Sequence, residues 1–275
     1  RGKKGTLVRL EIVEKKTGLD GPTKIVSIER NTIKLEEQAA KSSVVEVGEG
    51  SEQLRIGVID LPTFYMDFDA RTRGDENFRS TTRDVRRLIA EFEQTGIDAL
   101  IVDLRSNGGG SLSEATDLTG LFIDKGPVVQ VRNSRGRVQL ERDTDSGVAF
   151  EGPLAVLVDR NSASASEIFA GAIQDYNRGI VLGEPTFGKG TVQNLVDLNR
   201  FDDTMDGKLG QLKATIAQFF RVAGGSTQHK GVIPDINFPT ALSTTDQGES
   251  ALENALPWDK IAAARFRPTR NELSD

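Results

Sequence analysis

Apolar and polar positions change their period along the chain, and these changes divide it into elements. Residues 6–13 and 24–35 alternate apolar and polar side chains with a period of two, which predicts two half-buried strands. The sequence between them, KKTGLDGP, is typical of a turn. Residues 36–53 are polar and rich in Gly and Glu, so we expect a boundary there.

Helical and strand patterns alternate from residue 54 onward, beginning with the strand LRIGVIDL. Val85, Leu88 and Phe92 recur at helical spacing, and Gly96 follows them as an expected C-terminal cap. The almost continuous apolar run DALIVDL is typical of a buried parallel strand. The same patterns predict further helices from about Ser111 and over 165–177, and further strands in PVVQVR, GPLAVLVD, GIVLG, GTVQNLVDL and KATIAQFFRVA. This alternation over 54–223 predicts an α/β domain with a largely parallel sheet.

The composition is globular and excludes several classes of chemistry. A chain of 275 residues with 37% hydrophobic content can bury a large core. A net charge of −6 argues against a general nucleic-acid binder, and without a run of 18 apolar residues we expect no membrane span. The chain has no cysteine, which excludes disulfides, thiolate metal sites and a cysteine nucleophile.

Three loops expected at the carboxyl ends of strands could carry chemistry, because ligands gather there in α/β sheets. The first, NGGGS (107–111), places three glycines directly before a helix. Glycine allows close approach of the backbone, and a helix start offers unpaired N–H groups, an arrangement that suits an oxyanion or a phosphate. A flexible turn with Ser111 and Glu114 as a capping box explains the pattern equally well.

The second loop contains three serines on alternate positions. Ser162, Ser164 and Ser166 lie just before an apolar helical face. Ser164 followed by Glu167 fits a capping box, which the local pattern alone favours. A nucleophile at the same position would also gain from the N–H groups and the positive dipole end of the helix.

The third loop, GEPTFGKGTVQ (183–193), imitates the phosphate-binding P-loop around Lys189. The match fails because Gly190 stands where Ser or Thr would hold Mg²⁺, and because a strand pattern follows in place of a helix. A lysine with a pKa depressed by burial can act as the base for a serine nucleophile. The single histidine, His229, is the other candidate base, although its polar loop also fits a solvated surface residue.

Long stretches of the sequence resemble a known family. They are DLRSNGGGSLSEATDLTGLFI, VDRNSASASEIFAGAIQDYNRGIVLGEPTFGKGTVQ, FFRVAGGSTQHKGVIPDI and ENALPWD. These segments are similar to the C-terminal processing peptidase family, which includes bacterial tail-specific proteases, and the resemblance extends from the first strands to about Trp258. It implies an α/β, ClpP/crotonase-like protease core with a mostly parallel sheet and a Ser/Lys catalytic pair.

The resemblance also implies roles for individual residues. The family nucleophile corresponds to Ser164 and the family base to Lys189, and Gln193 matches the residue that orients the lysine. Asp175 matches an acidic residue with a supporting role. The expected oxyanion hole consists of the backbone N–H groups of Ala165 and of Gly109 or Gly110.

A domain organisation follows from the same resemblance, since family members carry a PDZ domain ahead of the protease core. Residues 1–35 are expected to be the last strands of an incomplete PDZ domain and 36–53 a linker. Residues 54–240 are expected to form the Ser/Lys protease core, and 241–275 a polar C-terminal extension.

The expected function is that of a serine endopeptidase that processes or degrades proteins with apolar C-terminal tails through an acyl-enzyme, without metal or cofactor. The resemblance implies a periplasmic setting, unfolded or tagged protein substrates and an adaptor lipoprotein as a partner. Two alternatives stay open. One is a non-catalytic module that binds a peptide by β-augmentation, and the other is a nucleotide-binding protein built on the P-loop-like sequence.

Overall fold

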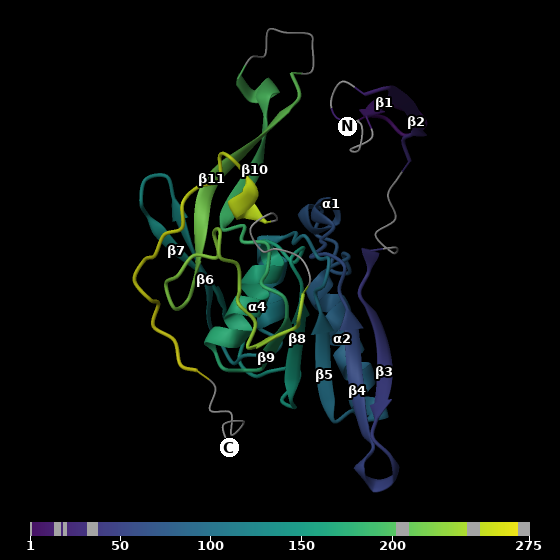
Figure 1. The fold of residues 1–275 in the computed structure, drawn as a ribbon, viewed down its shortest axis with the longest axis vertical. Coiled ribbons are helices and arrows are strands. Elements are labelled where there is room, and N and C mark those ends of the chain that lie inside the picture. The colour runs from purple at the N-terminus through teal and green to yellow at the C-terminus, as the bar shows by residue number, and fades with distance from the viewer. Residues whose placement is uncertain are drawn as a thin grey trace. The chain divides into compact units, whose positions relative to one another are not determined.

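The computed structural model divides the chain into two compact units, Arg1–Glu37 and Gln38–Asp275 (Figure 1). It describes residues 2–13, 18, 21–31, 38–201, 209–240 and 248–268. The described part of the first unit contains the antiparallel pair β1 (Leu7–Val13) and β2 (Thr23–Glu29). Both strands confirm the period-two prediction, and residues 32–35 lie outside the described residues. The assignment of this unit to a PDZ domain stays a prediction.

The second unit is built on a six-stranded sheet in the order β12-β9-β8-β5-β4-β3. Its strands are β3 (Lys41–Val47), β4 (Leu54–Asp60), β5 (Ala99–Asp103), β8 (Leu154–Val158), β9 (Ile180–Gly183) and β12 (Ile236–Asn237). All neighbouring pairs are parallel except β3 with β4. The predicted α/β fold with a mostly parallel sheet is therefore confirmed.

The range 36–53 holds an ordered strand, so its interpretation as a linker is wrong over β3. This strand pairs with β4 along its whole length, from Lys41 opposite Asp60 to Val47 opposite Leu54. All seven of its residues are exposed because it forms an edge of the sheet. An edge strand with little buried surface needs no apolar face, so the sequence KSSVVEV shows no clear period-two alternation.

A second sheet is antiparallel, with the order β10-β11-β6-β7. Its strands are β6 (Gly126–Asn133), β7 (Val138–Asp143), β10 (Thr191–Asp197) and β11 (Gln211–Arg221). Three of them were predicted as strands, whereas β7 was missed because most of its residues are exposed. Their separation from the parallel sheet was also missed, because it depends on long-range pairing such as that of β6 with β11.

The helices are α1 (Phe68–Thr72), α2 (Thr81–Thr95), α3 (Leu112–Thr119) and α4 (Ala165–Asp175), with short 3-10 turns at Gly50–Glu52, Leu198–Phe201 and Glu249–Ala251. Helices α2 and α4 pack on the parallel sheet, against β4 and β9, and α3 lies between these two helices; α3 and α4 also contact strands of the second sheet (Figure 1). Gly96 ends α2 with φ 72°, as predicted. Because α4 contacts β9 on one side and β6 and β11 on the other, it is almost entirely buried. No helix in the described ranges is long and apolar enough to cross a membrane.

Residues 248–268, expected to belong to a polar extension, form a strap along the loop after β11. The N–H groups of Ile261 and Ala264 donate to the carbonyls of Gly224 and Val222, at 2.9 and 2.8 Å. The Trp258 indole N–H donates to the Ser226 carbonyl at 2.9 Å. Backbone bonding of this kind needs no apolar pattern, so the sequence did not indicate it.

Candidate active site

Three loops meet at one edge of the parallel sheet, as the sequence predicts. They follow β5, β8 and β9, whose parallel pairing places all three carboxyl ends on the same side. A cavity of about 620 Å³ opens there. Its lining includes Gly108, Gly110, Ser111, Ser164, Ala165, Lys189 and Gln193. The serine and lysine singled out in the sequence therefore face the same space.

The three alternating serines differ in their surroundings. Ser162 and Ser166 are fully buried, and their hydroxyls donate to the carbonyls of Leu104 and Asn107 at 2.8 and 2.9 Å. Ser164 is half-buried and is the one of the three that lines the cavity. The geometry thus separates two structural hydroxyls from one that a ligand can reach.

The backbone of Ser164 is strained in a way that presents its side chain at the start of α4. Its φ and ψ are 58° and −110°, outside the regions that a residue with a Cβ ordinarily adopts. Such strain persists only where the surroundings hold it, and it concentrates at functional sites. One interaction that stabilises this conformation is the hydrogen bond that the Ser164 N–H donates to Glu167 Oε2 at 2.8 Å.

Lys189 lies in the loop after β9 and is half-buried. Burial lowers the pKa of its ammonium group, and the nearby charge of Lys213 lowers it further, while Glu249 and Glu167 oppose the shift. Desolvation disfavours the charged form, so a neutral amine becomes accessible at a lower pH than for a lysine in water. This is the property that a lysine base requires.

Glu167 connects the serine and lysine loops, a role that its position in a capping box only partly indicates. Its fully buried carboxylate accepts the backbone N–H groups of Ser164, Gly188 and Lys189, at 2.8, 2.7 and 2.9 Å. It also accepts the Thr186 hydroxyl at 2.6 Å. One carboxylate therefore fixes the positions of both loops.

Burial raises the pKa of Glu167 to about 7, although the four hydrogen bonds oppose the rise. A carboxyl with a raised pKa in the folded state stabilises the fold at low pH, and this contribution is lost as the pH rises from 4.5 to about 7.

We expect the free energy of unfolding to fall by up to about 3 kcal/mol as the pH rises over this range, because of Glu167. Urea denaturation at a series of pH values measures the fall, and Glu167→Gln should remove it. If the free energy of unfolding changed with pH in the same way in the parent and in Glu167→Gln, the prediction would be contradicted.

The glycine-rich loop offers one of its two expected N–H groups. The Gly109 N–H donates to Asn107 Oδ1 at 2.9 Å, so it is already engaged. The N–H groups of Gly110 and Ala165 have no hydrogen-bond partner among the described residues. Both glycines are required here, since a Cβ on Gly109 would lie 2.6 Å from the Ala163 carbonyl oxygen, and both have positive φ. Gly110 and Ala165 are thus the pair free to bind an oxyanion.

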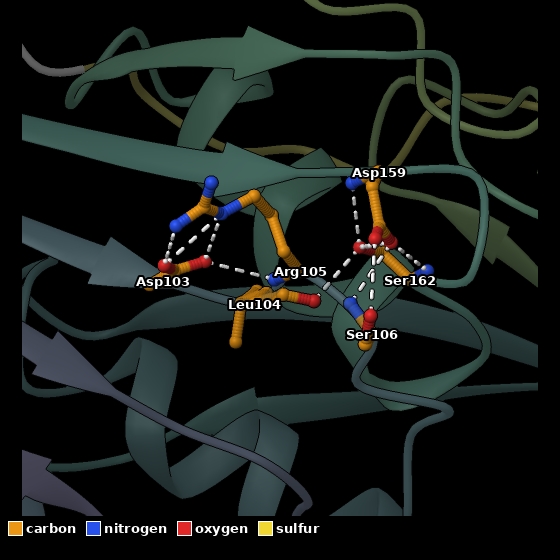
Figure 2. A network of polar contacts seen from close by, with 6 residues as sticks. All are labelled: Asp103, Leu104, Arg105, Ser106, Asp159 and Ser162. Atoms are coloured by element: carbon orange, nitrogen blue, oxygen red, sulfur yellow. Dashed lines mark hydrogen bonds and ion pairs between the residues drawn. The ribbon is translucent and has the colours of Figure 1, made fainter.

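Asp159 clamps the glycine-rich loop to the serine loop (Figure 2). Its Oδ1 accepts the N–H groups of Ser106, Asn161 and Ser162 at 2.9, 2.9 and 3.0 Å. Ser162 completes the link, because its hydroxyl donates to the Leu104 carbonyl. The loops that follow β5 and β8 are therefore held together by Asp159, which does not itself line the cavity.

Replacement of Asp159 tests this clamp. Asp159→Ala leaves the Ser106 and Asn161 N–H groups without their acceptor, whereas the Ser162 N–H keeps the backbone carbonyl of residue 159, at 2.9 Å. We expect the free energy of unfolding to fall by about 1–3 kcal/mol. Asp159→Asn keeps an oxygen acceptor and serves as the matched control, with a smaller loss. Urea denaturation measures both variants. Equal stability of the alanine variant and the parent would show that the clamp contributes little.

Of the other residues singled out in the sequence, Gln193 lines the cavity of Ser164 and Lys189, whereas Asp175 and His229 do not. Gln193 lines the cavity on β10, and its amide donates to the Thr215 hydroxyl at 3.5 Å; no described hydrogen bond joins it to Lys189. Asp175 does not line the cavity and forms an ion pair with Arg221, which ties α4 to β11. His229 lines a different cavity, of about 350 Å³, and does not share one with Ser164.

Two further kinds of site find no support. The segment after Lys189 is the strand β10, so the helix that a P-loop requires is missing from the place where it would begin. Across the described ranges no group of three or more acidic or histidine side chains is arranged to hold a metal ion.

Comparison with known families matches the chain to a peptidase family. Residues 55–238 match the family model "Peptidase family S41", and residues 242–273 match the model "C-terminal domain of tail specific protease". A "Tail-specific protease" of Haemophilus influenzae is 46% identical over 98% of this chain and 36% of its own length. The "Carboxyl-terminal-processing peptidase 2, chloroplastic" of Arabidopsis thaliana is 33% identical over 90% of this chain and 43% of its own length.

A solved structure shows the same likeness in three dimensions. The "photosystem II D1 C-terminal processing protease" superposes with a TM-score of 0.61 at 27% identity, covering 88% of this chain and 58% of that one. The chain thus spans less than half the length of each of the two curated relatives, 36% and 43%, and 58% of the chain in this solved structure.

Proposed function

Because this chain belongs to peptidase family S41, we propose that it is a serine endopeptidase with Ser164 as nucleophile and Lys189 as base. One observation carries the proposal. The half-buried serine at the strained start of α4 and a lysine with a lowered pKa line a single cavity. The same cavity lies next to two free backbone N–H groups, those of Gly110 and Ala165.

The proposed reaction follows from these positions. Ser164 Oγ attacks the carbonyl carbon of the peptide while Lys189 Nζ takes the hydroxyl proton. The negative charge that develops on the carbonyl oxygen is stabilised by the N–H groups of Gly110 and Ala165. Lys189 then gives the proton to the leaving amine, and an acyl group stays on Ser164. In the second half, Lys189 removes a proton from water while the water oxygen attacks the ester carbonyl carbon. Lys189 then gives this proton to Ser164 Oγ as the bond between Oγ and the acyl carbon breaks, which releases the acid product and restores the neutral lysine.

The supporting residues have separate proposed roles. Glu167 holds the serine and lysine loops at a fixed separation through their backbone N–H groups. Gln193 contributes to the wall beside Lys189 and orients its amine when substrate is bound. Asp175 supports α4 from outside the cavity through Arg221.

The proposed substrates are unfolded or tagged proteins with apolar C-terminal tails. The names of the relatives and the resemblance of the motifs support this class. The apolar part of the cavity wall, made of Phe68, Leu112, Ile168 and Phe219, would accept an apolar side chain next to the cleaved bond. We further propose a periplasmic location and an adaptor lipoprotein as partner, both from the resemblance alone.

Turnover of an unfolded test protein examines the proposal. Two versions would differ only in their last residues, either apolar or aspartate, and fragments would be identified by mass spectrometry with a chelator present and no nucleotide. We expect fragments from both and faster cleavage of the apolar version. Equal cleavage rates for the two versions would contradict the preference for apolar tails but would still support a peptidase. Binding without fragments would favour the non-catalytic peptide-binding module.

A further inference from the structure

The backbone around Lys189, which we call the lysine loop (residues 187–190), is held by two segments that follow β11. The Glu249 N–H donates to the Phe187 carbonyl at 2.9 Å, and the His229 N–H donates to the Gly188 carbonyl at 2.8 Å. Packing is tight as well, because a Cβ on Gly190 would lie 2.8 Å from the Gln228 nitrogen. The lysine loop therefore cannot shift without these segments.

A relay of side chains reaches the residue next to the lysine. Gln228 is fully buried, and its Oε1 accepts the Gly190 N–H at 2.8 Å. Its Nε2 donates to Glu249 Oε1 at 3.1 Å, and Glu249 is 9% exposed. An amide with both ends engaged in a buried site has a single orientation. The Gly190 N–H and the Glu249 carboxylate thus together fix the orientation of the Gln228 amide.

We propose that Glu249 is a positioning residue for the lysine base, acting through Gln228 on the backbone at Gly190. The proposal rests on the proposed function of Lys189. It implies that the C-terminal segment, through Glu249, influences the geometry at Lys189 in the peptidase segment. Glu249 belongs to residues 242–273, which match the C-terminal domain model, whereas Ser164 and Lys189 belong to residues 55–238, which match the peptidase model.

Glu249 also acts on Lys189 through its charge. Three charged groups of the described residues act on the lysine: Lys213 on β11, Glu167 on α4 and Glu249 on the C-terminal strap. Glu141 on β7 lines the same cavity. Glu249 and Glu167 favour the ammonium form of Lys189. Removal of the Glu249 charge should lower the pKa of Lys189, so the neutral amine, and with it activity, should appear at lower pH.

Two substitutions of Glu249 separate charge from position. Glu249→Gln keeps an oxygen acceptor for Gln228 and removes the charge, so we expect the pH–rate midpoint to move to lower pH with little change in kcat at high pH. Glu249→Ala removes the acceptor, and kcat should fall about 10- to 100-fold with KM nearly unchanged. Glu253→Gln, an exposed acid on the same strap, is the matched control and should behave as the parent.

A double-mutant cycle tests the route through Gln228. If Glu249 acts through this amide, Gln228→Ala with Glu249→Ala should lose no more kcat than Gln228→Ala alone, measured at a pH above the rate midpoint, where the charge effect on Lys189 no longer changes kcat. Losses that add would show two independent effects and would contradict the relay.

A direct titration of Lys189 keeps this proposal separate from the proposed function. NMR of the chain labelled with ¹³C at lysine Cε reports each lysine, and Lys189→Arg identifies the resonance. The midpoint should fall in Glu249→Gln and stay unchanged in Glu253→Gln. A lower midpoint in Glu249→Gln would demonstrate the charge effect of Glu249 on Lys189 even if the chain cleaved no substrate. An unchanged midpoint in Glu249→Gln, together with a parental kcat in Glu249→Ala, would overturn the inference.

Discussion

Ser164→Ala should abolish peptide cleavage, with a loss of at least about 10⁴-fold in kcat, since no other nucleophile would remain to form the acyl group. Ser162 and Ser166 cannot replace it, because both are fully buried and their hydroxyls are bonded to backbone carbonyls. The fold should persist, because the Ser164 backbone N–H still reaches Glu167. Cleavage of an unfolded protein, followed by mass spectrometry, measures the loss.

A serine elsewhere in the same cavity provides the control for this result. Ser113 lines the cavity at the start of α3. Ser113→Ala removes one hydroxyl that is hydrogen-bonded to the Ser111 hydroxyl at 3.0 Å and has no part in the proposed reaction, so kcat should stay within a few-fold of the parent. Substantial cleavage by Ser164→Ala would show that the nucleophile has been misassigned.

The second large effect is expected for Lys189. Lys189→Ala removes the base, and general base catalysis contributes about 10²–10⁴-fold, so turnover should fall by at least this factor. Lys189→Arg is the sharper test. It keeps a positive charge and a long side chain, yet a guanidinium does not deprotonate in this pH range and should be equally inactive.

The two variants exclude different explanations. If the lysine acted only through its charge, Lys189→Arg would retain most of the activity. If both variants cleaved at the parental rate, the base would lie elsewhere. His229 would be the next residue to test, although it lines a different cavity from Ser164.

The sequence predicts those parts of the molecule that leave a periodic or motif-like signal. The helix around Val85, Leu88 and Phe92 was predicted from its apolar spacing, and its end from Gly96. The convergence of the three loops was predicted because it follows from parallel pairing. The assignment of roles to Ser164 and Lys189 needed the family resemblance, since a capping box and a solvated lysine explain the local patterns as well.

Features that depend on long-range contacts were not predicted. The exposed strands β3 and β7 have no buried face and therefore leave no clear alternation. Glu167 looks like an ordinary helix cap, and its bonds to Gly188 and Lys189 come from a loop 21 and 22 residues away. The engagement of the Gly109 N–H by Asn107 is likewise a matter of three-dimensional geometry.

The pH dependence of acylation tests the central claim most directly. A slowly deacylating ester would be mixed with the parent chain from about pH 5 to about pH 9, and the rate of adduct formation on Ser164 measured by intact mass. Because Lys189 must be neutral to take the proton, the rate should rise with pH toward a plateau. The midpoint of this rise should lie below the pKa of a lysine side chain in water. A rate that is flat across this range, or unchanged in Lys189→Arg, would contradict the assignment of Lys189 as the base.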